Sequence, residues 1–289
     1  MATTARTIRP RWGTHLFLLT MSVMWLAPLL WAAYTALRPY GSTQRLGYFS
    51  VGGEYNLDNF ARAWTQSGFL TYLTNSVIIV VPTVFFTLAL SSMMAYAVTR
   101  VRWALSIPLL IAFTAGNLLP PQVLAAPLFA IFKNLRLPYW FSDSGSLLNT
   151  YISVIIVNLA FQVGFCTFVL ANYMKALSPD LTEAALVDGA GVWRRYWSIV
   201  LPLCRPALAA LATLEIIFIY NDFFWPLLFI TSGDRLPVTT AIKNLQGQFF
   251  SDYNLLAAGA LITLIPTLIV YLLLQRHFVA GLTLGSSKG

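Results

Sequence analysis

KALSPDLTEAALVDGAGVWRRYWSIVLP, residues 175–202, is a long polar stretch in a chain that is otherwise strongly apolar. A short loop would be enough to join two membrane helices, whereas this stretch carries helix signals of its own. Ser178 is a suitable N-cap, with Pro179 at the first helical position and Asp180 in the first turn. Gly189 can end that helix in a left-handed conformation. The stretch therefore predicts a short surface helix between two membrane segments.

A second helical run is expected from Val192 to Val200. Trp193, Tyr196, Trp197 and Val200 are spaced to share one face of a helix, so this run is predicted to be amphipathic. A surface helix held rigidly against a membrane domain is suited to docking a soluble partner.

The composition indicates an integral membrane protein. Of the 289 residues, 58% are hydrophobic and 10% are charged, and the mean hydropathy is +0.70, whereas a soluble domain carries about 25% charged residues. A membrane-spanning helix needs about 20 apolar residues. The sequence therefore predicts an all-α integral membrane fold with six transmembrane helices and no separate soluble domain. The six segments are residues 14–37, 70–98, 105–132, 149–173, 204–231 and 255–278.

The third segment is the least regular of the six, because Pro108, Pro120, Pro121 and Pro127 interrupt it. Prolines are tolerated in lipid only where neighbouring groups or water satisfy the backbone carbonyls that they release. Residues 117–127 are therefore a candidate bend that lines a translocation path. A kinked packing helix explains the same prolines equally well.

The basic residues predict the orientation, and their location argues against a nucleic-acid partner despite the net charge of +8. With the N-terminus inside, eleven Lys and Arg residues fall in inner segments and seven in the longer outer segments. Because positive charge collects on the cytoplasmic side of a membrane, both termini and residues 175–202 are expected in the cytoplasm. The inner residues are Arg6, Arg9, Arg11, Arg100, Arg102, Lys175, Arg194, Arg195, Arg205, Arg276 and Lys288, and the outer ones are Arg38, Arg45, Arg62, Lys133, Arg136, Arg235 and Lys243.

Several ordered matches in the polar stretch resemble the EAA loop of ABC importer permeases. They are Glu183-Ala184-Ala185, Asp188-Gly189-Ala190, Ile199 and Leu201-Pro202. Asn221-Asp222-Phe223 with Pro226 resembles the WNDF-type segment of carbohydrate permeases, although Tyr220 stands where Trp is usual. Residues 275–283 are similar to the C-terminal end of the maltose-type second permease. The resemblance covers most of the chain.

This resemblance implies a type I ABC importer permease fold with a cytoplasmic coupling helix, in a prokaryotic inner (cytoplasmic) membrane. The implied partners are a second, different permease subunit, two ATP-binding subunits, an extracytoplasmic solute-binding protein and the lipid bilayer. The implied solute is a disaccharide or oligosaccharide, with glycerol phosphate or a polyol as the alternative. The implied organisation is a cytoplasmic segment (1–13), a permease domain (14–280) with its coupling loop (175–202), and a cytoplasmic tail (281–289). Coupling to the ATPase is implied for Glu183, Ala184, Ala185, Leu186, Asp188, Gly189, Ala190 and Gly191.

Polar residues inside the apolar segments are candidates for pore or substrate contacts. Glu215 and Asp222 are seven residues apart, which places them two turns apart on one face of a continuous fifth helix, about 10 Å from each other. Ionisable groups within a membrane span usually face the bundle interior. The amide and hydroxyl side chains within the apolar segments, including Asn75 and Ser76, could instead form hydrogen bonds between helices, and this interpretation is favoured over solute contact. The pore candidates are Asn117, Gln122, Asn158, Gln162, Glu215, Tyr220, Asn221 and Asp222.

The sequence lacks the motifs of an enzyme. It has no GxxxxGK[ST] phosphate loop, so ATP-Mg is expected to be bound by partner subunits, and this chain is expected to have no ATPase site and no cofactor of its own. Cys166 and Cys204 are expected to be free thiols. A polytopic membrane transferase is a remote alternative, since it would need acids or histidines clustered at one interface.

Overall fold

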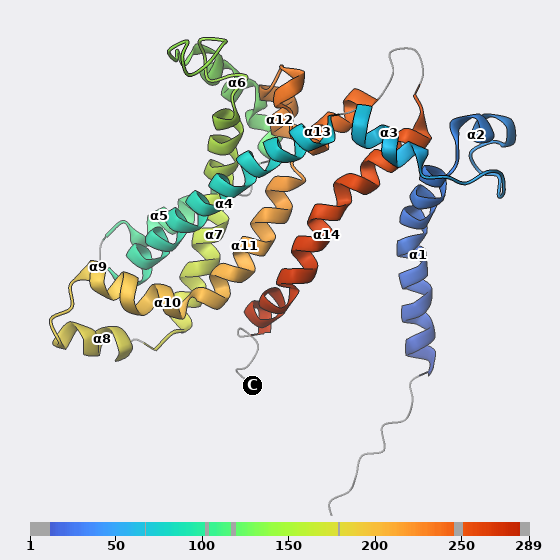
Figure 1. Ribbon diagram of the computed structural model, residues 1–289. Coiled ribbons are helices and arrows are strands. Elements are labelled where there is room, and N and C mark those ends of the chain that lie inside the picture. Colours follow the sequence, from blue (N-terminus) through green and yellow to red (C-terminus); the bar gives the residue numbers. More distant parts are fainter. Residues whose placement is uncertain are drawn as a thin grey trace, which may run out of the picture. The chain divides into compact units, whose positions relative to one another are not determined.

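The computed structural model describes residues 12–66, 68–101, 104–116, 120–178, 180–245 and 251–283, with the backbone alone at Gln66 and residues 276–283. Helices dominate these residues, together with one isolated β-bridge between Arg136 and Ser146. The chain divides into two compact units (Figure 1). Unit 1 comprises Met1–Gln66 and Leu245–Ile262, and unit 2 comprises Ser67–Asn244 and Thr263–Gly289.

The helices match the predicted all-α class. In chain order they are α1 (Trp12–Leu37), α2 (Tyr40–Leu46), α3 (Asp58–Gln66), α4 (Phe69–Arg100), α5 (Ser106–Gly116), α6 (Ala125–Asn134), α7 (Tyr151–Ala176), α8 (Asp180–Val187), α9 (Val192–Arg195), α10 (Leu201–Leu203), α11 (Arg205–Tyr220), α12 (Phe224–Phe229), α13 (Val238–Ala241) and α14 (Tyr253–Thr283). Short turns η1 (Pro121–Leu124), η2 (Tyr196–Val200), η3 (Gly233–Arg235) and η4 (Ile242–Leu245) join some of them.

Four helices are long and apolar enough to cross a membrane unaided, namely α1, α4, α7 and α14 as far as Gln275. Each lies within a few residues of its predicted segment. Two helix pairs pass the same test as bent spans. Ser106–Gly116 and Pro121–Asn134 differ in direction by 92°, and Val192–Leu203 and Arg205–Tyr220 by 71°. Six spans result if each bent pair counts as one.

The fifth segment is not the continuous helix that its hydropathy predicts over residues 204–231. Helix α11 ends at Tyr220, and α12 begins only at Phe224. At this break, Asp222 turns its carboxylate onto the backbone N–H groups that open α12. An acid in that position favours a new helix start over continuation of the old one, and hydropathy alone does not register this preference.

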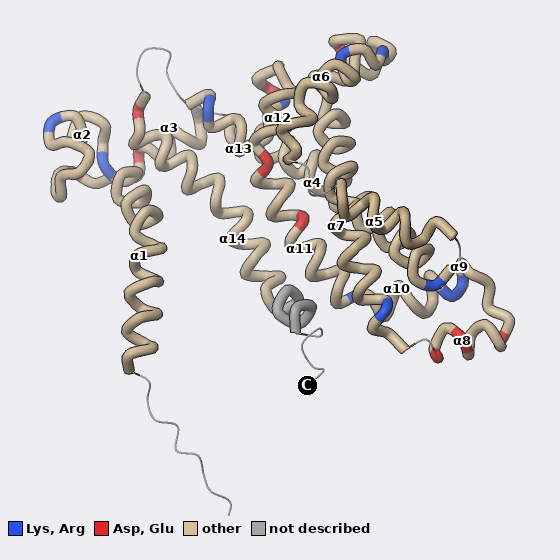
Figure 2. The backbone as a smooth tube through the Cα atoms, turned by 180° about the vertical axis from the view of Figure 1, so that it is seen from behind, with Lys and Arg blue, Asp and Glu red and all other residues tan. Residues whose placement is uncertain are grey.

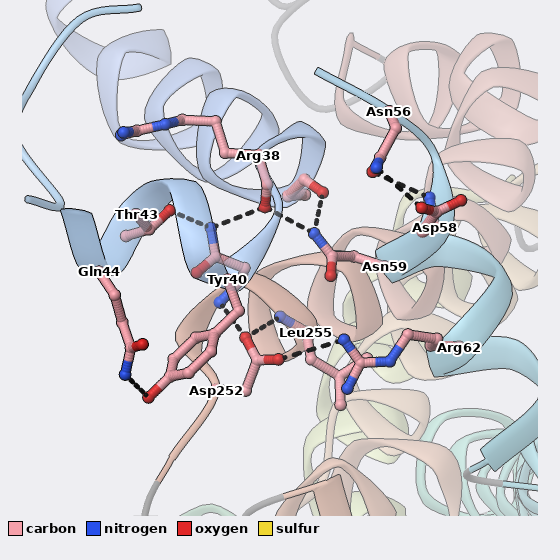
Figure 3. A network of polar contacts seen from close by, with 12 residues as sticks. Arg38, Tyr40, Thr43, Gln44, Asn56, Asp58, Asn59, Arg62, Asp252 and Leu255 are labelled. Carbon is pink, nitrogen blue, oxygen red and sulfur yellow. Dashed lines mark hydrogen bonds and ion pairs between the residues drawn. The ribbon is translucent and has the colours of Figure 1, made fainter. Parts of the chain in front are cut away.

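Unit 1 is held together by buried polar side chains that bond to the last carbonyl groups of α1 (Figure 3). The Asn59 amide of α3 donates 2.8 Å hydrogen bonds to the carbonyls of Ala36 and Arg38. The Asn254 amide of α14 donates to the carbonyls of Thr35 and Arg38, both at 2.9 Å. The last turn of a helix leaves its carbonyls without an intrahelical partner. The Thr35 carbonyl also accepts from the N–H of Arg38, the residue that follows α1, at 3.2 Å. Two amides thus fasten α1 to α3 and to the start of α14.

The core of unit 2 lies between α4, α7 and the α9–α11 region. Its fully buried members include Ala95 on α4, Leu170 and Met174 on α7, and Val200 and Cys204 further along the chain. This core joins the C-terminal halves of α4 and α7 to the polar stretch between α7 and α11, so that stretch is packed against membrane helices.

We expect Asn254→Ala to destabilise unit 1, because it removes the buried amide that joins the end of α1 and Thr43 to the start of α14. Each hydrogen bond lost in this way contributes about 0.5–1.5 kcal/mol. The measurement is the thermal unfolding midpoint of the purified protein in detergent. Asn244→Ala is the matched control, because Asn244 is exposed and donates a single bond to the Tyr72 hydroxyl. Equal midpoints for the two variants would contradict the stabilising role of Asn254.

Candidate functional site

Helix α8 forms with the predicted start and stop. The Asp180 N–H donates to Ser178 Oγ at 3.3 Å, and the same hydroxyl donates to Asp180 Oδ2 at 2.9 Å. Pro179 lies outside the described residues. After α8, Gly189 has a φ of 76°, and the Ala190 N–H donates to the carbonyl of Ala185. The chain therefore reverses through a left-handed glycine, and a Cβ on Gly189 would meet no atom within 4 Å. The glycine is needed for its backbone conformation and not for space.

The surface of α8 is open and carries both apolar and acidic groups. Leu186 is 56% exposed and Val187 is 88% exposed. Glu183, Ala184 and Asp188 are exposed as well. Of the eight predicted coupling residues, only Ala185 and Ala190 are partly covered, and the others, which are Glu183, Ala184, Leu186, Asp188, Gly189 and Gly191, are exposed. The predicted docking residues thus form an uncovered helix and turn.

The segment from Val192 to Val200 does not place its four large apolar side chains on one face, as the sequence predicts. Tyr196 and Val200 are buried at 2% and 1% exposure, whereas Trp193 and Trp197 are exposed at 66% and 54%. Over Tyr196–Val200 the helix makes a π turn, in which the Leu201 N–H donates to the carbonyl of Tyr196. A π turn holds one more residue than an α turn. The two indoles lie apart from the side chains that pack inward.

Side chains of α4 fix this run to the membrane helices. The hydroxyls of Ser92 and Tyr196 lie 2.8 Å apart. The rings of Tyr96 and Tyr196 have their centroids 5.3 Å apart, and the Tyr96 hydroxyl donates to the carbonyl of Val192 at 3.3 Å. Tyr196 is therefore held by a hydrogen bond, by ring packing and by the apolar core of unit 2.

Arg100, the last residue of α4, fixes the start of the polar stretch (residues 175–202). One guanidinium nitrogen of Arg100 donates to the carbonyls of Met174 and Leu177 at 2.6 and 3.0 Å. These are carbonyls at the end of α7, where a cation is also favoured by the helix dipole. The segments before and after α8 are thus both attached to α4, one through Arg100 and the other through Tyr196. These attachments allow a displacement of α8 to be transmitted to the membrane helices.

The break between α11 and α12 gathers polar groups around Asp222. Oδ1 accepts from the N–H groups of Phe224 and Trp225 at 3.0 and 3.3 Å. Oδ2 accepts from the Asn158 amide of α7 at 2.9 Å. The Thr239 hydroxyl donates to the Asp222 carbonyl at 3.1 Å. Asp222 therefore caps α12 and joins it to α7, and it does not lie on one helix face two turns from Glu215 as predicted.

Glu215 and Tyr220 are buried within α11. Glu215 is 0% exposed, and its Oε1 accepts from the Cys166 thiol at 3.2 Å, while Oε2 has no hydrogen-bond partner among the described residues. The Tyr220 hydroxyl donates to the Thr263 carbonyl of α14 at 3.1 Å. Both side chains are packed between helices in this conformation. Cys166 and Cys204 are free thiols, as predicted.

The remaining pore candidates differ in exposure. Asn221 and Gln122 are exposed, and the Asn221 amide donates to the carbonyl of Ile217 at 2.8 Å. Gln162 is half-buried, and its side-chain amide forms no hydrogen bond to another described residue. Asn117 lies outside the described residues. Residues of α5, α6 and α7 line an apolar pocket, among them Phe113, Leu128 and Phe161.

A family model described as the binding-protein-dependent transport system inner membrane component matches residues 87–283. The chain belongs to this family. The match includes the α8 turn, the Tyr196 attachment and the Asp222 break, so the geometry described above is that of a permease of this family.

Similar proteins cover nearly the whole permease. The diacetylchitobiose uptake system permease protein of Streptomyces coelicolor is 30% identical over 95% of this chain and 88% of its own length. The osmoprotective compounds uptake permease protein of Synechocystis is 30% identical over 95% of this chain and 91% of its own. A crystal structure of a bacterial ABC transporter that imports the acidic polysaccharide alginate matches with a TM-score of 0.77 and 20% identity, over 96% of this chain and 100% of that one. The structural match supports the type I permease fold.

Sequence reasoning did not single out Asn149, which joins the start of α7 to the segment after α12. Asn149 has a φ of 59°, and its Oδ1 accepts from the N–H groups of Thr231 and Ser232. Its position directly before the N-cap Thr150 of α7 is a usable signal, because asparagine tolerates left-handed backbone. Asn75 donates to the carbonyls of Asp234 and Leu236. This confirms the favoured interpretation that Asn75 bonds between segments.

We expect Tyr196→Ala to destabilise the permease, because a buried ring is lost from the attachment of the coupling run. Aromatic-to-alanine changes in a core cost about 3–5 kcal/mol, and Tyr196→Phe, which loses a hydrogen bond alone, about 1 kcal/mol. The measurement is thermal unfolding in detergent. Trp197→Ala is the control, since its side chain is exposed next to Tyr196. A Trp197 variant as unstable as Tyr196→Ala would contradict the attachment.

We expect Asp222→Ala to lower stability by about 0.5–2 kcal/mol through the loss of a helix cap. Asp222→Asn keeps a side-chain oxygen for the two N–H groups and should be closer to wild type. Thermal unfolding, measured beside the uptake KM, distinguishes a cap from a solute contact. If Asp222→Ala were fully stable and raised only the KM, the carboxylate would be a solute ligand and not a cap.

Proposed function

We propose that this permease is one membrane-spanning subunit of an ATP-driven importer, and that it forms half of the translocation path for a carbohydrate delivered by a solute-binding protein. The observation that carries the proposal is the exposed helix α8, attached on both sides to the spans through Arg100 and Tyr196. The family description, which specifies dependence on a binding protein, supports the delivery step. The polytopic transferase is not favoured.

Coupling to ATP runs through α8 in this proposal. Exposed Leu186 and Val187 provide apolar docking area, and Glu183 provides a charge for a basic residue of an ATP-binding subunit. ATP-Mg is bound by two such subunits and not by this chain. When they close, α8 moves as a rigid piece, and the Arg100 and Tyr196 attachments carry that motion to α4 and α7. Inward-open and outward-open states are then populated according to how strongly each partner binds each state.

A second, different permease subunit forms the other half of the path, because the chain resembles permeases that work as pairs of different subunits. Both termini and α8 lie in the cytoplasm in this arrangement, in agreement with the distribution of Lys and Arg. The solute-binding protein approaches from the opposite side, where the segments between α6 and α7 and between α12 and α14 are located.

A sugar is the solute class that the relatives favour, since two of the three proteins described above are named for diacetylchitobiose and for alginate. The name of the third, for osmoprotective compounds, keeps a polyol as the second candidate. Gln122 and Gln162 are the pore candidates whose amides are left without a partner among the described residues, and Asn117 remains a candidate from its sequence position. Neutral amides suit sugar hydroxyls. Asp222, Glu215 and Tyr220 are assigned to packing.

We expect Glu183→Ala to abolish most solute-stimulated ATP hydrolysis of the reconstituted complex. Truncating one partner of a buried charge pair at an interface costs about 2–5 kcal/mol. Hydrolysis and uptake are measured in vesicles that contain the permease with its partners, after assembly is checked. Glu54→Ala is the matched control, because Glu54 is an exposed acid of unit 1. Full stimulation in assembled Glu183→Ala complexes would contradict coupling through α8.

We expect Gly189→Val to weaken stimulation while Gly189→Asn largely retains it. A side chain at left-handed φ costs roughly 1–2 kcal/mol, and the cost is larger for β-branched residues and smaller for asparagine. Because a Cβ here meets no neighbour, only the backbone conformation distinguishes the variants. The same hydrolysis assay measures both. Identical loss in the two variants would show that the turn conformation is not the requirement.

A further inference from the structure

Charge is segregated along the polar stretch between α7 and α11. Helix α8 and its turn carry Asp180, Glu183 and Asp188 without a basic residue. The segment from Val192 to Arg205 carries three arginines without an acid. Figure 2 shows the acidic residues on α8 and the basic ones on the α9 segment that follows it. The two groups form no ion pair with each other, since both ion pairs found among the described residues lie elsewhere.

The three arginines, Arg194, Arg195 and Arg205, have no anionic partner in the described chain. Arg194 and Arg205 are exposed and Arg195 is half-buried, and none of their side chains forms a hydrogen bond or ion pair with another described residue. Arg100, at the same end of the spans, contrasts with them, because its guanidinium is bonded to helix carbonyls. Three uncompensated cations therefore lie on one short segment.

The direction of the segment places it near a membrane surface. Val192–Leu203 turns by 71° from Arg205–Tyr220. When α11 crosses the bilayer, a turn of that size brings the preceding segment close to the membrane plane. The exposed indoles of Trp193 and Trp197 contact the ring of Tyr196, with centroids 6.2 and 5.1 Å away. Indoles prefer the interface between headgroups and acyl chains, and basic helices with exposed aromatics lie in that interface.

We propose that the surface of Val192–Arg205 binds the phosphate headgroups of anionic phospholipids in the cytoplasmic leaflet. The arginines supply charge complementarity, and the two indoles enter the interface beside them. An ATP-binding subunit is a less suitable occupant, because the acidic and apolar α8 already provides that docking surface. The assignment of this surface to the cytoplasmic leaflet rests on the proposed function. Bound lipid would stabilise the segment that joins α8 to α11.

The test measures contact with lipid directly in the complete transporter, assembled in nanodiscs without nucleotide. Brominated phosphatidylglycerol or brominated phosphatidylcholine is mixed into a phosphatidylcholine bilayer, and tryptophan quenching is recorded. The quenching lost in the double variant Trp193→Phe/Trp197→Phe belongs to these two indoles. We expect that component to be at least about fivefold stronger with the anionic lipid, the factor corresponding to about 1 kcal/mol for one basic residue near an anionic surface.

The preference should disappear in the triple variant Arg194→Gln/Arg195→Gln/Arg205→Gln. It should persist in the matched control Arg45→Gln/Arg136→Gln/Lys243→Gln, which removes three cations from segments predicted to be outside. Equal quenching by both lipids in the wild type would overturn the proposal. Absence of any quenching from the two indoles in the assembled transporter would overturn it too, since the ATP-binding subunit would then cover them. Solute-stimulated hydrolysis, assayed on the same discs, tests the proposed function separately.

Discussion

A hydrocarbon layer offers no water to an unpaired backbone group, and this constraint explains the placement of several buried polar side chains of the permease. Each interruption of a helix releases carbonyl or N–H groups that need a partner. Asn59 and Asn254 bond to the carbonyls at the end of α1, Arg100 to those at the end of α7, and Asp222 to the N–H groups that open α12. The broken architecture is therefore possible because a small set of polar side chains completes the backbone hydrogen bonding.

The same constraint separates what could be predicted from what could not. Hydropathy identifies α1, α4, α7 and α14 within a few residues, because apolar length decides whether a helix spans. Local turn chemistry likewise predicts α8, from the Ser178 cap to the left-handed Gly189. The predicted placement of Asp222 on one helix face with Glu215 is wrong, because hydropathy does not register the helix break that the hydrogen bonds of this carboxylate accompany. The hydrogen-bond partners of Asp222 come from α7, from α12 and from Thr239, and their proximity is a property of the tertiary fold.

The proposed coupling requires a stiff connection between α8 and the spans. A signal that begins at a surface helix is lost if the intervening chain bends. The permease limits bending with two attachments to one span, the guanidinium of Arg100 and the ring and hydroxyl of Tyr196. Both are contacts to α4, which packs along α7. In the proposed mechanism, α4 would therefore receive motion from both sides of α8.

The π turn over Tyr196–Val200 shows how the number of residues in a helix affects the direction in which its side chains point. An extra residue in a helix changes the angular phase of everything on one side of it, by about 100° for each residue of an α-helix. In this permease Tyr196 and Val200, the first and last residues of the turn, both lie in the core while the neighbouring indoles lie outside it. A homologue that lost one residue here could keep every side-chain type and still present α8 in a different direction. The docking geometry of such transporters can thus diverge by insertion or deletion while the contact residues stay the same.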